Sequence, residues 1–335
     1  SGDVPTVQRA TATPLSPTAT PERATATTAA PTATPEGAAA TQMAPTATSE
    51  RATATPQVAT ATPQVATATP QVATATPQAA TATPHAIATP ESLSLARVAI
   101  SDATSYDRKL IRERVRDVLD GIGGLGDVIS AGDRVAIKVN LTGGTSVRPL
   151  SGVSPVDSYV THPEVVRALG ELVRDAGARE IYIVEAVYEW ESYSAWGYEE
   201  VATALGATLI DLNAPGPYGD FVPAPVGEGW FVYPDYTINP ILTEIDVFAS
   251  VAKMKCHWSC GITLSMKNLV GLVPVSHYRC APNDWVRSDL HGCGGEFKTR
   301  LPGSVVDLTR VRPIHLALID GVKTVEAGEG PWTKT

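Results

Sequence analysis

The feature that most constrains the fold is a seven-residue repeat that fills the first 94 residues. Units that begin Thr-Ala-Thr recur from Thr11 to Thr81, and the later copies read TATPQVA almost perfectly. Pro closes most units, and a Pro in a helix removes a hydrogen bond and clashes with the preceding turn. The period of seven is therefore not that of a coiled coil. Extended, polyproline-like backbone is the default, with a rise of about 3.1 Å per residue.

The repeat also lacks the residues that build a core. All 20 aromatic residues of the chain lie after residue 94, and the first of them is Tyr106. Without them, residues 1–94 cannot offset the entropy cost of ordering their backbone. Two interpretations stay open: a disordered linker, of which a glycosylated stalk is one form, or repeats that assemble into an extracellular fibre.

Dense Thr beside Pro is typical of O-glycosylated stalks. We expect the acceptors in the most regular copies, at Thr53, Thr55, Thr60, Thr62, Thr67, Thr69, Thr74 and Thr76. Both interpretations of the repeat predict an extracellular or cell-surface location, and the fibre interpretation adds self-assembly.

Residues 95–335 show a different pattern, in which apolar strands alternate with amphipathic helices. This order predicts an α/β domain with a mainly parallel sheet and helices on both faces. Strands are expected at 97–101, 134–141, 180–185, 208–212, 246–252 and 315–320. Helices are expected at 107–119, 163–176, 198–205, 265–269 and 304–311.

The carboxyl ends of these strands should gather the chemistry, because ligands of parallel sheets bind there. The rule places Lys138–Asn140, Glu185, the segment 253–257 and Asp320 in one neighbourhood. His162 precedes a helix that begins with Pro163, so helix capping and catalysis are both open for it.

The densest cluster is KMKCHWSCGITLSMKNLVGL, residues 253–272. Lys255, His257 and Lys267 are the candidate catalytic residues. The lysines would hold a carboxylate or phosphate together with backbone N–H groups near Thr263. His257 would move a proton or bind a metal, and a desolvated Lys267 would act as a base or nucleophile. Substrate-binding roles are expected for Lys138, Asn140, Thr263, Asn268 and Glu185.

The charge of the chain excludes some partners. The net charge is −9, of which the repeat, with three Arg and five acids, carries −2. No basic run or Arg-rich helix is present, which argues against nucleic acid as a partner. No stretch approaches the 18 apolar residues of a transmembrane helix. A small anionic ligand is the partner that the lysine cluster predicts.

Residues 134–335 resemble the bacterial and archaeal domain-of-unknown-function family 362. The matching stretches are VAIKVNL (135–141), THPEVVRALGELVRDAGAREIYIVE (161–185), VAKMKCHWSCGITLSMKNLVGL (251–272) and LALIDGVKTVEAGEGP (316–331). The resemblance implies an α/β domain whose activity is poorly characterised. Family members continue past GEGP, so the resemblance also implies that residues 95–335 form a C-terminally incomplete domain.

A fainter similarity is to the nickel-pincer lactate racemases. In that family a His precedes, by ten positions, the Lys that carries the nickel cofactor, and a further His binds nickel. Here His257 precedes Lys267 by ten and His277 follows. This similarity implies a divalent metal held by His257 and His277.

Four cysteines follow residue 255, at Cys256, Cys260, Cys280 and Cys293. With an exported repeat, disulfides are the simpler assignment, and three pairings are open. We favour Cys280–Cys293, with Cys256 and Cys260 either paired or left as thiols. A metal site of Cys256, His257 and Cys260 with His277 or His291 is the alternative.

Two functions follow. One is an exported enzyme or redox accessory with an anion-binding and metal-binding pocket. The other is a structural fibre or adhesive stalk protein, glycosylated on its repeats, whose domain does not turn over a substrate.

Overall fold

The computed structural model describes residues 96–147, 152–325 and Gly330. The chain divides into two units, Ser1–His85 and Ala86–Thr335, and only the second contains described residues. The repeat, with its predicted glycosylation sites, lies outside the described residues.

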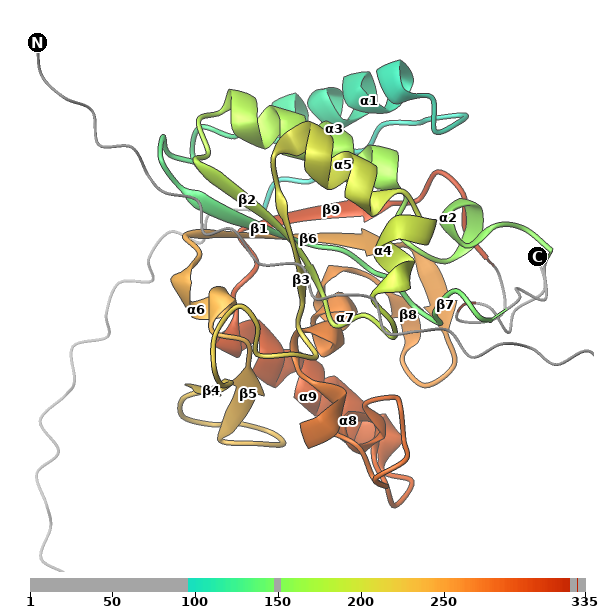
Figure 1. Ribbon diagram of the computed structural model, residues 1–335, viewed down its shortest axis with the longest axis vertical. Coiled ribbons are helices and arrows are strands. Elements are labelled where there is room, and N and C mark those ends of the chain that lie inside the picture. The colour runs from blue at the N-terminus through green and yellow to red at the C-terminus, as the bar shows by residue number, and fades with distance from the viewer. Residues whose placement is uncertain (1–95, 148–151, 326–329, 331–335) are drawn as a thin grey trace, which may run out of the picture. The chain divides into compact units, whose positions relative to one another are not determined.

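A five-stranded parallel sheet forms the centre of the domain (Figure 1). Its order is β3 (Thr208–Asp211), β2 (Glu180–Glu185), β1 (Arg134–Lys138), β6 (Val247–Lys253) and β9 (Leu316–Asp320). The central strands are buried on both faces, which explains why β1 and β6 read as nearly continuous apolar runs.

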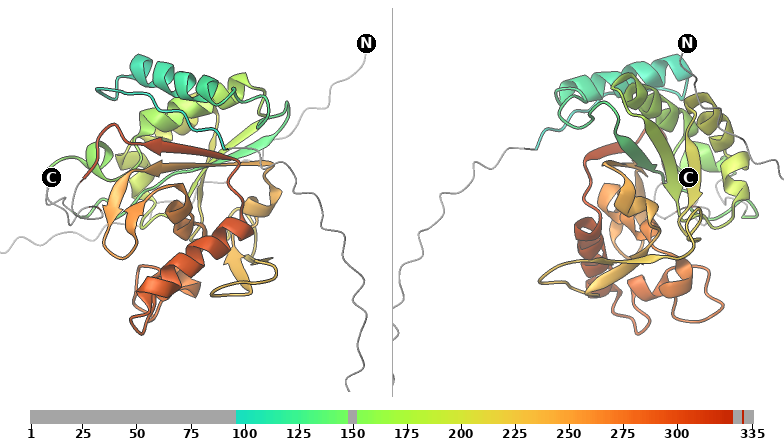
Figure 2. Two further views of the ribbon diagram at one scale, coloured as in Figure 1. Left: turned by 180° about the vertical axis from the view of Figure 1, so that it is seen from behind. Right: turned by 60° about the vertical axis from the view of Figure 1, so that its left-hand side comes forward.

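Helices cover both faces of the sheet (Figures 1 and 2). One face carries α1 (Arg108–Gly121), α3 (Pro163–Asp175) and α5 (Tyr198–Leu205), with α2 (Pro155–Ser158) and α4 (Glu191–Ala195) beside its carboxyl edge. The other face carries α6 (Ile241–Glu244), α7 (Ser265–Asn268), α8 (Ser288–His291) and α9 (Phe297–Val311). The predicted fold class, a mainly parallel sheet with helices on both faces, is confirmed.

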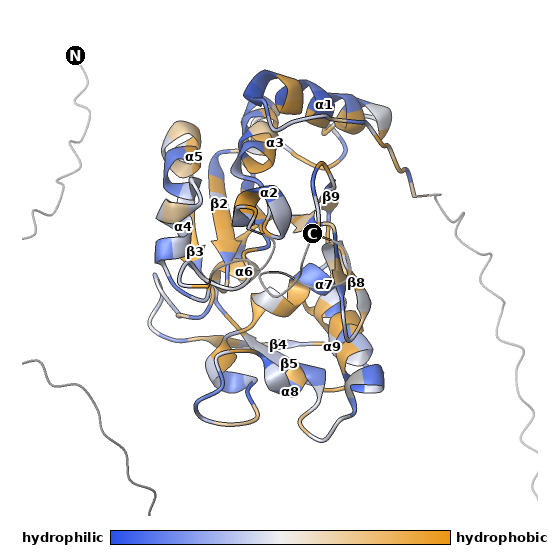
Figure 3. Cartoon of the chain, turned by 90° about the vertical axis from the view of Figure 1, so that its right-hand side faces the viewer, coloured by the Kyte–Doolittle hydropathy of each residue, from blue (hydrophilic) through white to orange (hydrophobic). Residues whose placement is uncertain are grey.

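Each face of the sheet has its own apolar core. Ile111, Val115 and Leu119 of α1 recur every four residues and enter the first core, while the opposite side of α1 is polar (Figure 3). The second core lies under α9 and the hairpin of β4 (Val222–Pro225) and β5 (Asp235–Ile238). This hairpin lies in the segment between β3 and α6.

Two element predictions are wrong. Residues 97–101 form no strand: Val98 is 82% exposed, and Arg97 Nη1 donates to Ile122 O at the end of α1 (2.7 Å). Only three of these five residues are apolar, and short apolar runs are the ambiguous case for pattern reading. Helix α9 begins at Phe297 rather than 304, and continues through Pro302. None of the described helices is long and apolar enough to span a bilayer.

Candidate functional site

A buried ion pair lies where β1 and β2 end. Lys138 Nζ is 2.8 Å from Glu185 Oε1, and the two side chains are 0% and 4% exposed. The Glu185 carboxylate also accepts the backbone N–H groups of Leu141 and Ala186, both at 2.9 Å. Burial lowers the pKa of Lys138, while the charge of Glu185 opposes that shift. Both charged groups thus have partners within the protein. The pair forms the bottom, or floor, of the pocket described below.

Asn268 of α7 ties this floor to the neighbouring strand. Its Oδ1 accepts from Lys138 Nζ and from Asn140 Nδ2, both at 3.2 Å. Its Nδ2 donates to Lys138 O (3.3 Å) and Ser250 Oγ (3.2 Å). Among the described residues no donor reaches the buried Asn140 Oδ1, and no partner reaches the buried Thr263 Oγ1. Both atoms are thus buried polar groups without a hydrogen-bond partner among those residues.

Above the floor lies a pocket of about 360 Å³. All eight residues predicted as catalytic or substrate-binding line it: Lys138, Asn140, Glu185, Lys255, His257, Thr263, Lys267 and Asn268. The described lining residues include four cations (the three lysines and Arg287) and only one carboxylate, Glu185. Cations thus outnumber carboxylates among the described lining residues, although the chain as a whole is acidic.

The hairpin of β7 (Lys255–His257) and β8 (Gly261–Thr263) supplies one wall. Side chains alternate along a strand, so Lys255 and His257 share the side that lines the pocket, whereas Cys256 is exposed and does not line it. Lys255 is 4% exposed, and its Nζ donates to Thr142 Oγ1 (3.1 Å) and Tyr159 O (3.0 Å).

Two imidazoles stack in this pocket, His257 and His291, with ring centroids 5.8 Å apart and planes 15° apart. Burial lowers the pKa of His257 to about 3, aided by the charge of Lys267. Burial and Lys267 likewise lower the pKa of His291 to about 4. Both rings are therefore neutral at neutral pH.

Hydrogen bonds to Nδ1 give the two rings opposite tautomers. The Ser259 N–H (3.3 Å) and the Ser259 hydroxyl (3.0 Å) both contact His257 Nδ1. With the N–H donating to Nδ1, the neutral ring carries its proton on Nε2. His291 Nδ1 lies 2.9 Å from Arg287 O, a carbonyl that only accepts, so His291 Nε2 is unprotonated. In this arrangement Nε2 is a donor in His257 and an acceptor in His291.

Arg287 is the pocket residue that sequence reasoning missed. It is 8% exposed, and it donates from Nε to Val273 O (2.5 Å) and from Nη2 to Ala186 O (3.3 Å) and Asn213 Oδ1 (3.2 Å). Burial lowers its pKa. The charges of Glu185 and Asp211 oppose this shift, but within the described residues no carboxylate lies within ion-pair distance of Arg287.

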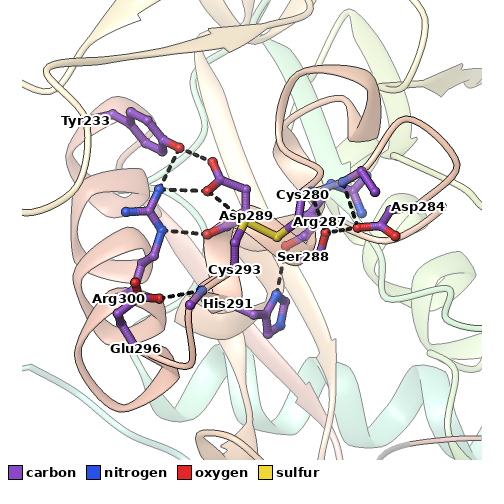
Figure 4. Close-up of a disulfide and its surroundings, with 12 residues drawn as sticks. Tyr233, Cys280, Asp284, Arg287, Ser288, Asp289, His291, Cys293, Glu296 and Arg300 are labelled. Atoms are coloured by element: carbon purple, nitrogen blue, oxygen red, sulfur yellow. Dashed lines mark hydrogen bonds and ion pairs between the residues drawn. A yellow bond between two sulfur atoms is a disulfide. The ribbon is translucent and has the colours of Figure 1, made fainter. Parts of the chain in front are cut away.

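A disulfide holds the segment that carries Arg287 and His291 (Figure 4). Cys280 and Cys293 are bonded, as predicted, and close a loop with a sequence separation of 13. Asp289, within this loop, pairs with Arg300 Nη2 of α9 (2.9 Å) and accepts from Tyr233 OH. Cys256 and Cys260 are thiols. The sequence predicts this disulfide loop, and the polar residues within it are the signal that could have identified Arg287.

A second buried ion pair lies outside the pocket. Lys253 Nζ is 3.1 Å from Asp320 Oδ2, and Tyr106 OH donates to Asp320 Oδ1 (2.7 Å). The single neighbourhood predicted at the strand ends is therefore wrong, because neither Lys253 nor Asp320 lines the pocket. His162 lies here too: its Nδ1 accepts the Glu164 N–H (3.1 Å), which caps α3, and its ring stacks on Tyr106.

The structure does not bring the two predicted metal ligands into one pocket. His277 does not line the pocket of His257, because its 3₁₀ turn, Val275–His277, sets the ring edge-on against Phe221 (5.5 Å). The imidazole beside His257 is His291. No group of three His, Cys, Asp or Glu suited to a metal occurs among the described residues. His257 and Lys267 do share the pocket, but the described residues do not complete the nickel site of the lactate racemases, and metal binding stays a prediction.

Comparisons with known proteins place these features in context. A thylakoid-associated protein of Synechocystis sp. is 25% identical over 236 residues, which are 70% of this chain and 65% of that protein. The lactate racemase apoprotein of Thermoanaerobacterium thermosaccharolyticum has a TM-score of 0.36 and 16% identity, over 67% of this chain and 49% of the racemase. A protein from Thermotoga maritima has a TM-score of 0.34 and 12% identity, over 63% and 48%.

The chain thus spans less than two thirds of the relative from Synechocystis and about half of each solved structure. Structural likenesses at these scores support no statement about a reaction. The sequence family described as Domain of unknown function (DUF362), in contrast, matches residues 135–335, more than half of the chain. The chain therefore belongs to the DUF362 family.

Proposed function

We propose that this domain binds a small carboxylate- or phosphate-bearing molecule in the pocket and moves a proton on it. The observation that carries the proposal is Arg287, a buried cation in the pocket wall without a carboxylate partner among the described residues. A buried charge is costly unless it is paired. An anion bound in the pocket that Arg287 lines would lie near this cation and reduce that cost.

Four pocket residues have roles in this proposal. The ammonium groups of Lys255 and Lys267 and the Nε2–H of His257 hold the anionic group of the ligand. His291 Nε2 accepts a proton from an adjacent atom of the ligand. Because Lys267 and burial hold the pKa of His291 at about 4, the negative charge of a bound ligand would raise it. The proton acceptor would gain basicity when substrate binds.

Thermal unfolding of the full chain tests the binding step, with inorganic phosphate, acetate or glycolate added at constant ionic strength. We expect at least one of these anions to raise the Tm of the wild type, because a ligand that binds only the folded state stabilises it. Lys267→Ala should remove most of that rise. Lys109→Ala, which removes a charge from the exposed side of α1, is the matched control. No rise with any anion, or an equal rise in Lys267→Ala, would overturn the proposal.

Proton NMR of the histidine rings tests the second step. The His291 resonance should titrate near pH 4 in buffer alone and nearer to its ordinary value of 6.5 when the stabilising anion is present. A His291 pKa that does not respond to the anion would separate binding from proton transfer and leave only a binding domain.

We also propose that the domain is displayed outside the cell on the repeat. Two observations support this location: the Thr/Pro-rich composition of residues 1–94 and the Cys280–Cys293 disulfide, a bond that persists in oxidising compartments. Intact mass of the natural protein should show hexose on the repeat, and protease treatment of whole cells should release the domain. A repeat that forms filaments, with a domain inert toward all anions, would favour the structural alternative instead.

A further inference from the structure

The pocket adjoins a second cavity, and Arg287 lies where the two meet. The second cavity has a volume of about 300 Å³ and shares Ala186, Tyr188 and Arg287 with the first. Its own lining residues include Asn213, Ser276 and Arg279. Each of the two volumes lies at the lower end of the size range of small-molecule sites. Arg287 lines both cavities, whereas Lys255 and Lys267 line only the first.

The guanidinium of Arg287 is fixed on one side only. Its Nε and Nη2 donate to Val273 O, Ala186 O and Asn213 Oδ1. These bonds orient the group, which reduces the entropy cost of a further contact. Among the described residues no acceptor contacts Nη1.

The carboxylates that line the two cavities have partners of their own. Glu185 is paired with Lys138. Asp284 of the second cavity accepts from Ser288 Oγ (2.5 Å) and from the Ala281 N–H (3.2 Å). Neither carboxylate lies within ion-pair distance of Arg287, although the charge of Glu185 counteracts the burial that lowers its pKa. A single anion held at Lys255 and Lys267 would therefore leave Nη1 of Arg287 without a direct acceptor among the described residues.

We infer that the site takes a short dianion, a dicarboxylate or a phosphorylated carboxylate. One anionic group sits with Lys255 and Lys267, and the other binds Nη1 of Arg287 at the junction of the two cavities. This inference rests on the proposed function and adds the class of ligand to it. Charge-assisted hydrogen bonds from a fixed guanidinium are the interactions that distinguish a carboxylate from a neutral amide of the same shape.

Isothermal titration of the full chain tests the inference with matched ligands at fixed ionic strength: succinate against succinamate, and glutarate against its half-amide. Each pair has the same size, but only the diacid has the second charge. We expect one diacid to bind about tenfold or more tightly than its half-amide, the ratio expected for one charge-assisted contact. Arg287→Lys should reduce this ratio below about threefold, whereas Lys267→Ala should weaken both ligands together.

Asn213→Asp provides a second variant if Arg287→Lys does not fold. It would place a resident carboxylate beside Nη2, 3.2 Å from it in the present structure, and so remove the preference for the diacid. Arg116→Gln removes an exposed Arg from α1 and should leave the ratio unchanged. Equal binding of diacid and half-amide would refute the dianion while the anion pocket stands. Failure of every ligand to bind would refute both proposals.

Discussion

The Lys138–Glu185 pair provides the sharpest test of how this site is built. Lys138→Met keeps most of the side-chain volume and removes the ammonium group. Glu185 would then be a buried carboxylate with two backbone N–H partners and no cation within the floor. Breaking a buried pair by removing one partner costs about 3–5 kcal/mol. Both side chains are at most 4% exposed here, so we expect about 4 kcal/mol.

The double variant Lys138→Met/Glu185→Gln separates the charge from the packing. It removes the uncompensated charge while Gln keeps one oxygen for the Leu141 or Ala186 N–H. We expect it to recover about 2 kcal/mol of the loss, within the range of coupling energies for residues in contact. Lys109→Met on the exposed side of α1 should change stability by less than about 0.5 kcal/mol.

Equilibrium urea unfolding at pH 7, followed by Trp fluorescence, measures all four proteins. The slope with denaturant should stay constant, so that the midpoint reports stability. A free energy of unfolding for Lys138→Met within about 1 kcal/mol of the wild type would refute the reasoning, because removing one partner of a buried ion pair costs more than that. So would a double variant less stable than Lys138→Met. Loss of anion binding without loss of stability would return Lys138 to the substrate-binding role predicted from the sequence.

Three further predictions concern the same pocket. The pKa values of His257 and His291, about 3 and about 4, lie below the ordinary 6.5, so the unfolded chain binds more protons. Stability should be complete above pH 6.5 and fall toward pH 4; a flat Tm profile across that range would contradict this. Gly271→Ala should lower stability by about 1–3 kcal/mol, because its Cβ would lie 2.3 Å from a carboxylate oxygen of the buried pair. Gly126→Ala, with open space around the Cβ, is its control in urea unfolding. Replacing the disulfide Cys280–Cys293 by two Ser should cost about 3 kcal/mol for its loop separation of 13, and should also weaken anion binding. Equal anion affinity in the wild type and in the variant with two Ser would show that the disulfide does not position the pocket.

The sheet and most of the pocket could be predicted because both follow from local pattern. Apolar runs such as those of β1 and β6 identify central parallel strands, and parallel strands carry their ligand-binding groups at the carboxyl edge. That rule, with the cluster at 253–272, selected the eight predicted residues that line the pocket. Local pattern could not show that Lys138 and Glu185 satisfy each other, since that depends on their separation in space.

The residues that the sequence assigned to the wrong neighbourhood depend on three-dimensional geometry, which the periodicity of a sequence does not determine. Lys253 and Lys255 are two positions apart and would share one face of a continuous strand. The strand pairing is interrupted at Met254, which lies between β6 and β7, so Lys253 pairs with Asp320 while Lys255 lines the pocket. The proton positions on His257 and His291 likewise depend on a neighbouring N–H and a neighbouring carbonyl, which a sequence does not locate.

The composition of the pocket wall that contains Arg287 explains why this domain has a disulfide beside its pocket. Between Cys280 and Cys293, Leu290 is the only buried hydrophobic residue among those described. A segment with so little apolar burial cannot hold a desolvated guanidinium in place through packing. The disulfide and the Asp289–Arg300 pair fix the wall instead. In the proposed function this wall contacts a polar ligand, so more apolar residues there would stabilise the free protein and remove the groups proposed to bind. An anion that binds only the folded state would stabilise this wall, so we expect the ligand and the disulfide to stabilise the same segment.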